Sequence, residues 1–419
     1  MNIKLKCIEC SKEYDAKEIR YRCECGELLE VVPDLKVFKR SGKEWREHFE
    51  KGSDKIAFLR YRDVLLPDLP DNKVVSLEEG DTPLYKANRK LKEFFGVDNL
   101  YLKHEGMNPT LSFKDRGMVA GVSWANFLGV DIVACASTGD TSASMSAYAA
   151  RGDIKRVVLL PEGKISFEQL SQPMSSGAIT LGLDTDFDGC MKIVQELTEK
   201  HPIYLLNSMN SFRIEGQKAI GIEALHQLDW EVPDWFVIPV GNAGNISALG
   251  KGLRELQELG IIDKLPRLAG VETEGANPLY ESYKDGWADL KPVTAKKTVA
   301  SAIRIGNPVS FKKAKRELHL SNGVMEQVSD KEIMDAKAIV DSTGIPICPN
   351  SGAAVAGLKK LVDVGTIKKS DKVVVILTAH GAKFSQAVID YHKSNAKYAN
   401  KPKSLPANLE AVEKALELK

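Results

Sequence analysis

Short apolar runs and longer stretches with helical spacing alternate along most of the chain. Apolar runs of strand length cover residues 99–105, 132–136, 156–160, 179–183, 203–206, 235–240 and 373–378. Repeats with helical spacing follow several of them, at 118–128, 141–150, 187–200, 246–259 and 329–343. Strands that alternate with helices in this way predict parallel sheets flanked by helices, with ligands beside the carboxyl ends of the strands.

The end of the chain carries a further helical repeat. Leu409, Val412, Ala415 and Leu416 recur at helical spacing within residues 407–419. An apolar stripe of this kind needs a surface to cover it, so we expect this helix to pack on the body of the protein.

Composition is that of an ordinary globular protein. The 419 residues carry a net charge of +1, which argues against a nucleic-acid or anionic-membrane partner. No apolar run reaches the roughly 20 residues of a membrane helix, and residues 1–10 lack the features of a targeting peptide. Seven cysteines, an odd number, fit free thiols in a reducing compartment. We therefore expect a cytoplasmic protein of two or three domains.

One lysine stands at a predicted helix start. The sequence Asn-Pro-Thr-Leu-Ser-Phe-Lys-Asp covers residues 108–115, and Ser112 and Asp115 have the spacing of a helix-capping pair. The amides and dipole of the helix are expected to lower the pKa of the Lys114 ammonium. A neutral amine can form a Schiff base with an aldehyde. Taken alone, an exposed first-turn lysine explains the same pattern.

A second turn indicates an anion site. The apolar run 235–240 leads into Gly241, Asn242, Ala243, Gly244 and Asn245, and a helical repeat follows. A strand, a glycine-containing turn and a helix start direct backbone amides at one point, which suits a phosphate. A plain strand-to-helix turn is the alternative.

These two turns and further motifs resemble the pyridoxal-phosphate-dependent enzymes of the tryptophan-synthase-β fold type. Within that group they resemble the threonine synthase family, especially its plant-type subfamily. The motifs follow in chain order between residues 80 and 390: residues 112–115, 136–143, 159–161, 184–191, 207–218 and 378–381. The resemblance implies fold type II, an α/β architecture with two three-layer parallel-sheet domains and a small zinc-ribbon-like segment at the start.

The resemblance also implies a division of the chain. Residues 1–35 would form the Cys-rich segment, and residues 36–125 with 226–395 a discontinuous, large cofactor-binding domain. Residues 126–225 would form a small mobile domain, and residues 396–419 a C-terminal helical extension.

Each motif residue has an implied role. Lys114 would form the Schiff base with pyridoxal phosphate and then transfer protons. The cofactor would also contact Asp140, Gly241, Asn242, Ala243, Gly244, Asn245 and Thr378, the last through the pyridine nitrogen. The substrate would bind Ser137, Thr138, Thr141, Asn207, Ser208 and Arg213. An arginine suits a phosphate because its fork bonds two oxygens; a contact of Arg213 with a local acid such as Glu215 is the alternative.

The implied reaction converts O-phospho-L-homoserine and water to L-threonine and phosphate, by a lyase of threonine biosynthesis that acts as a homodimer. Two alternatives remain open at this point. One is another fold type II enzyme, a dehydratase or a β-replacement enzyme for a different phosphorylated or hydroxylated amino acid. The other is a cofactor-free binding protein led by a metal module.

Four cysteines near the start form a candidate zinc site. Cys7 and Cys10 are separated by two residues, but Cys23 and Cys25 by one, so the spacing approaches that of a zinc ribbon without matching it. Gly26 supplies the tight turn that such a knuckle uses. Reduced, half-buried thiols of a small cap are the alternative to a structural zinc ion.

Three positions depart from patterns common among relatives. Leu111 and Val240 stand where glycine is frequent, and Asp140 stands where many relatives have asparagine. Val240 fits if its φ is negative. His104 and His380 flank two motifs, and we interpret them as structural residues.

Overall fold

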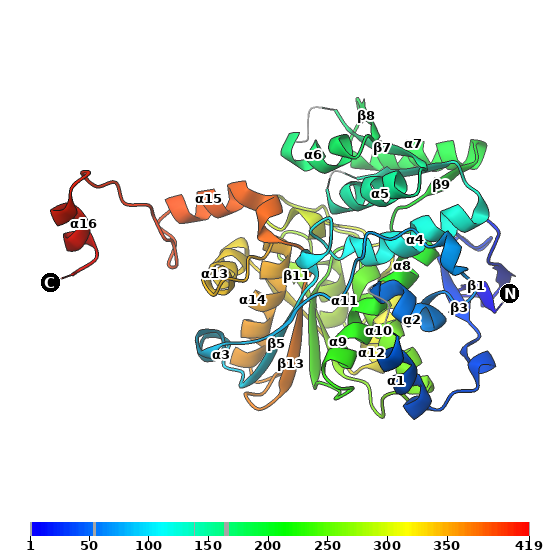
Figure 1. The fold of residues 1–419 in the computed structure, drawn as a ribbon, viewed down its shortest axis with the longest axis horizontal. Coiled ribbons are helices and arrows are strands. Elements are labelled where there is room, and N and C mark those ends of the chain that lie inside the picture. Colours follow the sequence, from blue (N-terminus) through cyan, green and yellow to red (C-terminus); the bar gives the residue numbers. More distant parts are fainter. Residues whose placement is uncertain (1, 53–55, 138, 163–166, 419) are drawn as a thin grey trace.

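A computed structural model describes residues 2–52, 56–137, 139–162 and 167–418, in which the strands form three sheets (Figure 1). Within these residues, no helix combines the length and apolarity needed to cross a membrane. The two larger sheets lie one above the other in the view of Figure 1, and the small third sheet lies beside them near the N-terminus.

The largest sheet has six strands and is parallel except at one edge. Its order is β12 (Val324–Val328), β11 (Arg267–Thr273), β10 (Trp235–Pro239), β13 (Lys372–Leu377), β5 (Asn99–His104) and β4 (Leu84–Lys86). Only β4 runs antiparallel to its neighbour. The predicted parallel sheet is therefore correct, with an antiparallel edge strand added.

Helices cover both faces of this sheet. Every residue of β10 is buried; Phe236 and Ile238 belong to one core, and Trp235 and Val237 to another. The first core includes α9 (Ala219–Gln227), α10 (Gly244–Glu258) and α12 (Phe311–Leu320). The second includes α3 (Arg89–Phe95), α13 (Asp330–Asp341) and α14 (Pro349–Asp363). A strand covered on both faces has no reason to alternate polar and apolar residues, which explains the continuous apolar runs.

The second sheet has four parallel strands. Its order is β8 (Ile179–Leu183), β7 (Lys155–Pro161), β6 (Ile132–Ala136) and β9 (Ile203–Leu205). Helices α5 (Asp140–Arg151) and α7 (Phe187–Lys200) contact it, and α6 (Phe167–Ser175) packs against α5. Residues of α5 and α7 belong to different cores, as do alternate residues of β6. The prediction of two three-layer α/β units with parallel sheets is thus confirmed.

The remaining elements lie around these two units. They are β1 (Ile3–Cys7), β2 (Glu13–Asp15), β3 (Leu29–Pro33), α1 (Gly42–Lys51), α2 (Ala57–Leu65), α4 (Lys114–Leu128), α8 (Ser211–Gly216), α11 (Pro278–Lys284), α15 (Ser385–Lys393), α16 (Leu409–Ala415) and the 3-10 helices η1 (Leu35–Phe38), η2 (Asp71–Lys73), η3 (Glu105–Met107), η4 (Ser301–Ile303) and η5 (Gly381–Phe384). Helix α4 packs against both α5 and α8, and so lies at the junction of the two units.

The C-terminal helix differs from its prediction. Helix α16 forms within the predicted range, but it lies at the end of an extended segment, away from the body (Figure 1). Leu409 and Leu416 are 73% and 62% exposed. The expectation that this helix packs on the body is therefore wrong for this conformation of the chain, because no element lies beneath its apolar stripe.

Candidate active site

The predicted site residues follow the carboxyl ends of parallel strands in both large sheets. The lysine turn follows β5, Ser137 and Asp140 follow β6, and Asn207 follows β9. The turn that starts at residue 241 follows β10, and Thr378 follows β13. Thr138 lies outside the described residues. Because such ends meet at one edge, two sheets that face each other bring these residues together.

The loop before Lys114 is held by Asp115. Helix α4 begins at Lys114 after Phe113, with no side-chain cap, so the predicted capping pair is wrong. The Asp115 carboxylate instead accepts hydrogen bonds from the Thr110 amide at 2.7 Å, the Thr110 hydroxyl at 2.5 Å and the Ser144 hydroxyl at 2.5 Å. Asp115 thereby ties the loop to α5 rather than closing the helix end.

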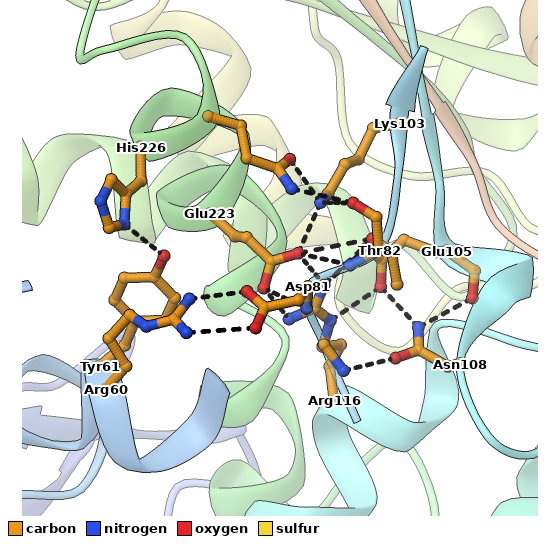
Figure 2. Close-up of polar contacts among 12 residues, drawn as sticks. Arg60, Tyr61, Asp81, Thr82, Lys103, Glu105, Asn108, Arg116, Glu223 and His226 are labelled. Carbon is orange, nitrogen blue, oxygen red and sulfur yellow. Dashed lines mark hydrogen bonds and ion pairs between the residues drawn. The ribbon is translucent and has the colours of Figure 1, made fainter. Parts of the chain in front are cut away.

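A buried ionic network fixes the first turn of α4. Arg116, two residues after Lys114, donates hydrogen bonds to Glu105 at 2.8 Å and 2.9 Å and to Glu223 at 2.6 Å and 2.7 Å (Figure 2). Lys103 on β5 donates to Glu223 at 2.5 Å. These contacts join α4, β5, η3 and α9, so they hold the lysine-bearing turn against the large sheet.

Lys114 lies in a setting that favours its neutral form. Its Nζ lies 4.2 Å from the centre of the Phe113 ring, a contact that favours the ammonium, but among the described residues it has no hydrogen-bond or ion-pair partner to hold the charge. Burial lowers the pKa of the Lys114 ammonium to about 7, the nearby Arg213 cation acts in the same direction, and Asp140 opposes them. The neutral amine is therefore far more accessible near pH 7 than for an ordinary lysine.

Two residues in this region have left-handed backbones. Leu111 has φ of +64° and Ala243 has φ of +62°, a region that costs a residue with a side chain roughly 1–2 kcal/mol. Leu111 stands where glycine is frequent among relatives, and glycine adopts such a positive φ freely. Val240 does not have a positive φ, so its side chain is accommodated as expected.

The turn after β10 forms a cradle for an anion. Ala243, in the left-handed conformation, precedes the first residue of α10, an arrangement that makes successive amides point to one side. A Cβ on Gly241 would lie 2.8 Å from the Cα of Ile303, so only glycine fits there. The buried hydroxyl of Ser310 has no partner among the described residues and lies 3.8 Å from where a Cβ on Gly244 would stand. An orphaned hydroxyl beside a nest of amides fits the phosphate of pyridoxal phosphate.

The amides of this turn are held by side chains. Asn242 donates to the Ser208 hydroxyl at 3.4 Å and accepts from the Val309 amide at 3.4 Å. Asn245 donates to the Pro239 carbonyl at 2.6 Å. The contact of Asn242 with Ser208 joins the cradle to the loop after β9, which belongs to the other sheet.

Arg213 is a buried cation without a counter-ion. Its Nη2 donates to the Thr141 hydroxyl at 3.1 Å, and its Nε has no partner in the described part of the chain. Among the described residues no carboxylate pairs with it, because Glu215 pairs with Lys218 and Lys251. The alternative role as partner of a local acid is therefore wrong. Burial lowers the pKa of Arg213 to about 10, which an added anion would relieve.

Several predicted ligands have local partners in this structure. The Asn207 side chain accepts from the Ala136 amide at 2.9 Å and donates to the Ala136 carbonyl at 2.8 Å, so it joins β6 to β9. The Ser137 hydroxyl accepts from the Gly139 amide at 3.3 Å. Asn207 therefore positions the loop that carries Ser208.

Thr378 lies directly beside the lysine loop. Its carbonyl accepts from the Phe113 amide at 2.9 Å, and its hydroxyl lies 3.3 Å from the Ser351 hydroxyl. Its own amide donates to Ser351 at 2.8 Å. The Thr378 and Ser351 hydroxyls thus lie within hydrogen-bond distance of each other beside the lysine loop.

Sequence reasoning missed Lys383, Ser351 and Ser310. Lys383 in η5 pairs with Asp140 at 2.7 Å and donates to the Thr110 carbonyl at 3.0 Å, so it ties α5 to the lysine loop. Lys383 stands two residues beyond the motif 378–381, and no local pattern marked it. Ser351 lies in the first turn of α14, which begins at Pro349. Proline is common at the first position of a helix, so Pro349 was a signal for this helix that the sequence analysis did not use.

Comparisons with known proteins agree with this geometry. Residues 75–379 match the family described as "Pyridoxal-phosphate dependent enzyme". The chain is 47% identical to a threonine synthase of Methanocaldococcus jannaschii, covering 92% of this chain and 94% of that protein. It is 44% identical to threonine synthase 2, chloroplastic, of Arabidopsis thaliana, covering 96% of this chain and 81% of that one.

Solved structures support the fold independently. The threonine synthase of Escherichia coli superposes with a TM-score of 0.73 at 21% identity, covering 99% of both chains. A threonine deaminase of Solanum lycopersicum superposes with a TM-score of 0.65 at 22% identity, covering 80% of this chain and 94% of that one. On the sequence identities over nearly its whole length, the chain belongs to the threonine synthase family of pyridoxal-phosphate-dependent enzymes.

Proposed function

We propose that the chain converts O-phospho-L-homoserine and water to L-threonine and inorganic phosphate. The family supplies the reaction, and Arg213 is the single observation that supports a phosphorylated substrate. A buried guanidinium with no carboxylate partner is costly unless an anion binds beside it. Thr141 and Lys114 lie next to it, so the anion would be held beside the reactive amine.

The residues of the site divide the work by their chemistry. Bound pyridoxal phosphate would supply an electron sink for the amino-acid substrate, with its phosphate at Gly241–Asn245 and Ser310 and its ring nitrogen at Thr378. Lys114 would anchor the cofactor and carry protons at Nζ, which its lowered pKa favours. The Lys383 ammonium would pair with Asp140 and so hold α5 against the lysine loop.

Arg213→Met tests the substrate assignment. We expect kcat/KM for phosphohomoserine to fall roughly 30- to 1,000-fold, the cost of removing a buried charged partner. The fold should survive because Arg213 has no counter-ion to leave unpaired; the cofactor-free variant should melt no lower than the parent chain. Phosphate release and threonine formation are measured against substrate concentration.

Arg151→Met is the matched control, since Arg151 is exposed at the end of α5. It should leave kcat/KM unchanged. An Arg213→Met enzyme with unchanged KM, together with faster turnover of phosphoserine or threonine than of phosphohomoserine, would favour the dehydratase or β-replacement alternative.

Cofactor capture should depend on pH through Lys114. We expect covalent binding of pyridoxal phosphate to the cofactor-free chain to accelerate as pH rises, with a midpoint of about 7, because only the neutral amine reacts. Arg213→Met should move the midpoint upward and Asp140→Asn downward, since these groups lower and raise the Lys114 pKa respectively. Stopped-flow absorbance measures the rates. A midpoint near an ordinary lysine value, about 10.4, would contradict the proposed environment.

The expected homodimer, cytoplasmic location and five-segment division stay predictions. The Arabidopsis relative is named chloroplastic.

A further inference from the structure

Four cysteines meet outside the active site, in the small sheet β2-β1-β3. Cys7 is the last residue of β1, Cys10 belongs to the turn that follows it, and Cys23 and Cys25 belong to the turn before β3. Their four sulfurs all lie within 4.8 Å of one another, with Cys7 and Cys25 at 3.5 Å and Cys10 and Cys23 at 3.5 Å. All four thiols are free.

The distances match a tetrahedral metal site. Zinc–sulfur bonds of about 2.3 Å place the corners of a tetrahedron about 3.8 Å apart, within the observed range. The backbone is shaped for thiolates, since the Glu9 amide donates to the Cys7 sulfur at 3.4 Å. Gly26, with φ of +90°, closes the second turn through a 2.9 Å bond from its amide to the Cys23 carbonyl. Four sulfur ligands leave no open position, the arrangement of structural rather than catalytic zinc.

The same module contacts the elements that carry the anion-binding residues. The Leu29 carbonyl in β3 accepts from the Ser211 hydroxyl at 2.7 Å and from the Lys313 ammonium at 2.6 Å. The Tyr21 hydroxyl, in the segment between the two cysteine pairs, accepts from the Leu205 amide at 2.7 Å. Lys312 adds ion pairs to Glu9 at 3.0 Å and Glu27 at 2.7 Å.

Each contact lies within three residues of a site residue. Ser211 is two residues before Arg213 in α8, and Leu205 is two residues before Asn207 at the end of β9. Lys313 is three residues after Ser310, at the start of α12. Both turns of the cysteine cluster therefore lead into chain segments that support the binding site for phosphate groups.

We propose that Cys7, Cys10, Cys23 and Cys25 bind one structural zinc ion, and that the module closed by this ion positions Arg213 and its neighbours for the substrate phosphate. The second part rests on the proposed function. Zinc acts here as a cross-link between two turns, and the effect reaches the site through Leu29 and Tyr21.

The metal is tested on the full-length holoenzyme by elemental analysis. We expect one zinc per chain, its loss on treatment with a chelator, and its recovery with added zinc. Cobalt(II) in its place should give the thiolate charge-transfer and d–d bands of a tetrahedral site. Cys10→Ser/Cys25→Ser, at the two exposed ligands, should lose the metal, whereas Cys190→Ser should keep it.

Three results would overturn the site: no zinc after purification and zinc addition, disulfides among these cysteines, or iron in place of zinc. Chelation of the unmutated chain keeps the test valid where the serine variants fail to fold.

The positioning role is tested by the affinity for phosphate. Removing zinc should weaken binding of inorganic phosphate and raise the KM for phosphohomoserine about tenfold, with kcat changed less than twofold. Tyr21→Phe keeps the metal but loses one hydrogen bond. It should raise the Kd for inorganic phosphate and the KM for phosphohomoserine about fivefold each. Tyr280→Phe in α11 is the control. The positioning role would be overturned if removing zinc lowered kcat by the same factor as it raised KM, or if the affinity for phosphate did not change.

These measurements distinguish failure of the zinc inference from failure of the proposed reaction. Zinc content and phosphate affinity, measured by calorimetry, do not require turnover. A chain that binds zinc and loses phosphate on chelation, yet does not release phosphate from phosphohomoserine, would retain the inference and reject the proposed substrate.

Discussion

Lys114→Ala should abolish turnover, with a loss of at least about 10³-fold, and remove the long-wavelength absorbance of covalently held pyridoxal phosphate. The amine is at once the cofactor's anchor and the proposed proton carrier, so no neighbouring group replaces it: Lys383 is engaged by Asp140, and Arg213 remains protonated. Steady-state assay and absorbance spectra check the result. Lys155→Ala, at an exposed lysine of β7, should change neither.

Stability offers a second, activity-independent readout of the same residue. The folded-state pKa of Lys114, about 7, lies below the unfolded value of about 10.4, so the unfolded chain binds more protons between these pH values. The cost of burying this amine is complete below pH 7 and disappears as pH rises to about 10.4. Cofactor-free Lys114→Met should therefore melt higher than the parent at pH 6 and equally at pH 10.5. A difference that does not vary with pH would contradict the buried setting of the amine.

Strands were predictable because burial on both faces makes them continuous apolar runs. The predicted range 132–136 coincides with β6, whose last four residues are buried, and 187–200 coincides with α7. The predicted range 179–183 coincides with β8, although that strand is largely exposed. Helix α14 was missed because residues 349–358 are all buried and rich in Gly and Ala, so most of the helix has no polar face to reveal a helical period. Residues 306–310 form a loop that brings Ser310 to the cradle.

The candidate site was predictable as motifs but not as contacts. Lys114 and the turn 241–245 carry local signals, namely a helix start and a glycine-containing turn. Ser310 and Lys383 have none, because their partners lie far along the chain and only folding brings them together. The absence of an ion pair between Arg213 and Glu215 could have been predicted. Residues two apart on a helix point to different sides, so Glu215 was an unsuitable partner.

The cysteine cluster and the C-terminal helix are two places where residue spacing alone did not predict the structure. Irregular spacing of Cys23 and Cys25 argued against a zinc ribbon, yet the fold brings the four sulfurs within 4.8 Å. The stripe of α16 argued for packing, yet its residues are exposed. A spacing pattern describes one element, whereas a ligand set or a packed face depends on the position of a second.

Arg116→Met should be the most destabilising of these changes, lowering the free energy of unfolding by about 3–5 kcal/mol at neutral pH. The network then holds Glu105 and Glu223 against Lys103 alone, and a carboxylate is left buried without a full partner (Figure 2). Burial alone would raise the pKa of both carboxyls, but the surrounding cations outweigh it and lower the pKa of each. The stability that the ionised carboxylates contribute is therefore present above their unfolded-state pKa of about 4.3, and it is lost as pH falls through their folded-state pKa.

The penalty of Arg116→Met should accordingly shrink below about pH 4.3, where protonation neutralises the unpaired carboxylate. Denaturant unfolding of the cofactor-free chain at pH 7 and pH 4 measures it. Arg89→Met, at an exposed ion pair with Glu93, should cost no more than about 0.5 kcal/mol. Adding Glu223→Gln to Arg116→Met should restore part of the loss, because it removes the charge that the arginine compensated. A double variant as unstable as the sum of the single ones would show that these side chains do not act as one network, and that Lys114 is held by the packing of α4 against α5 and α8 instead.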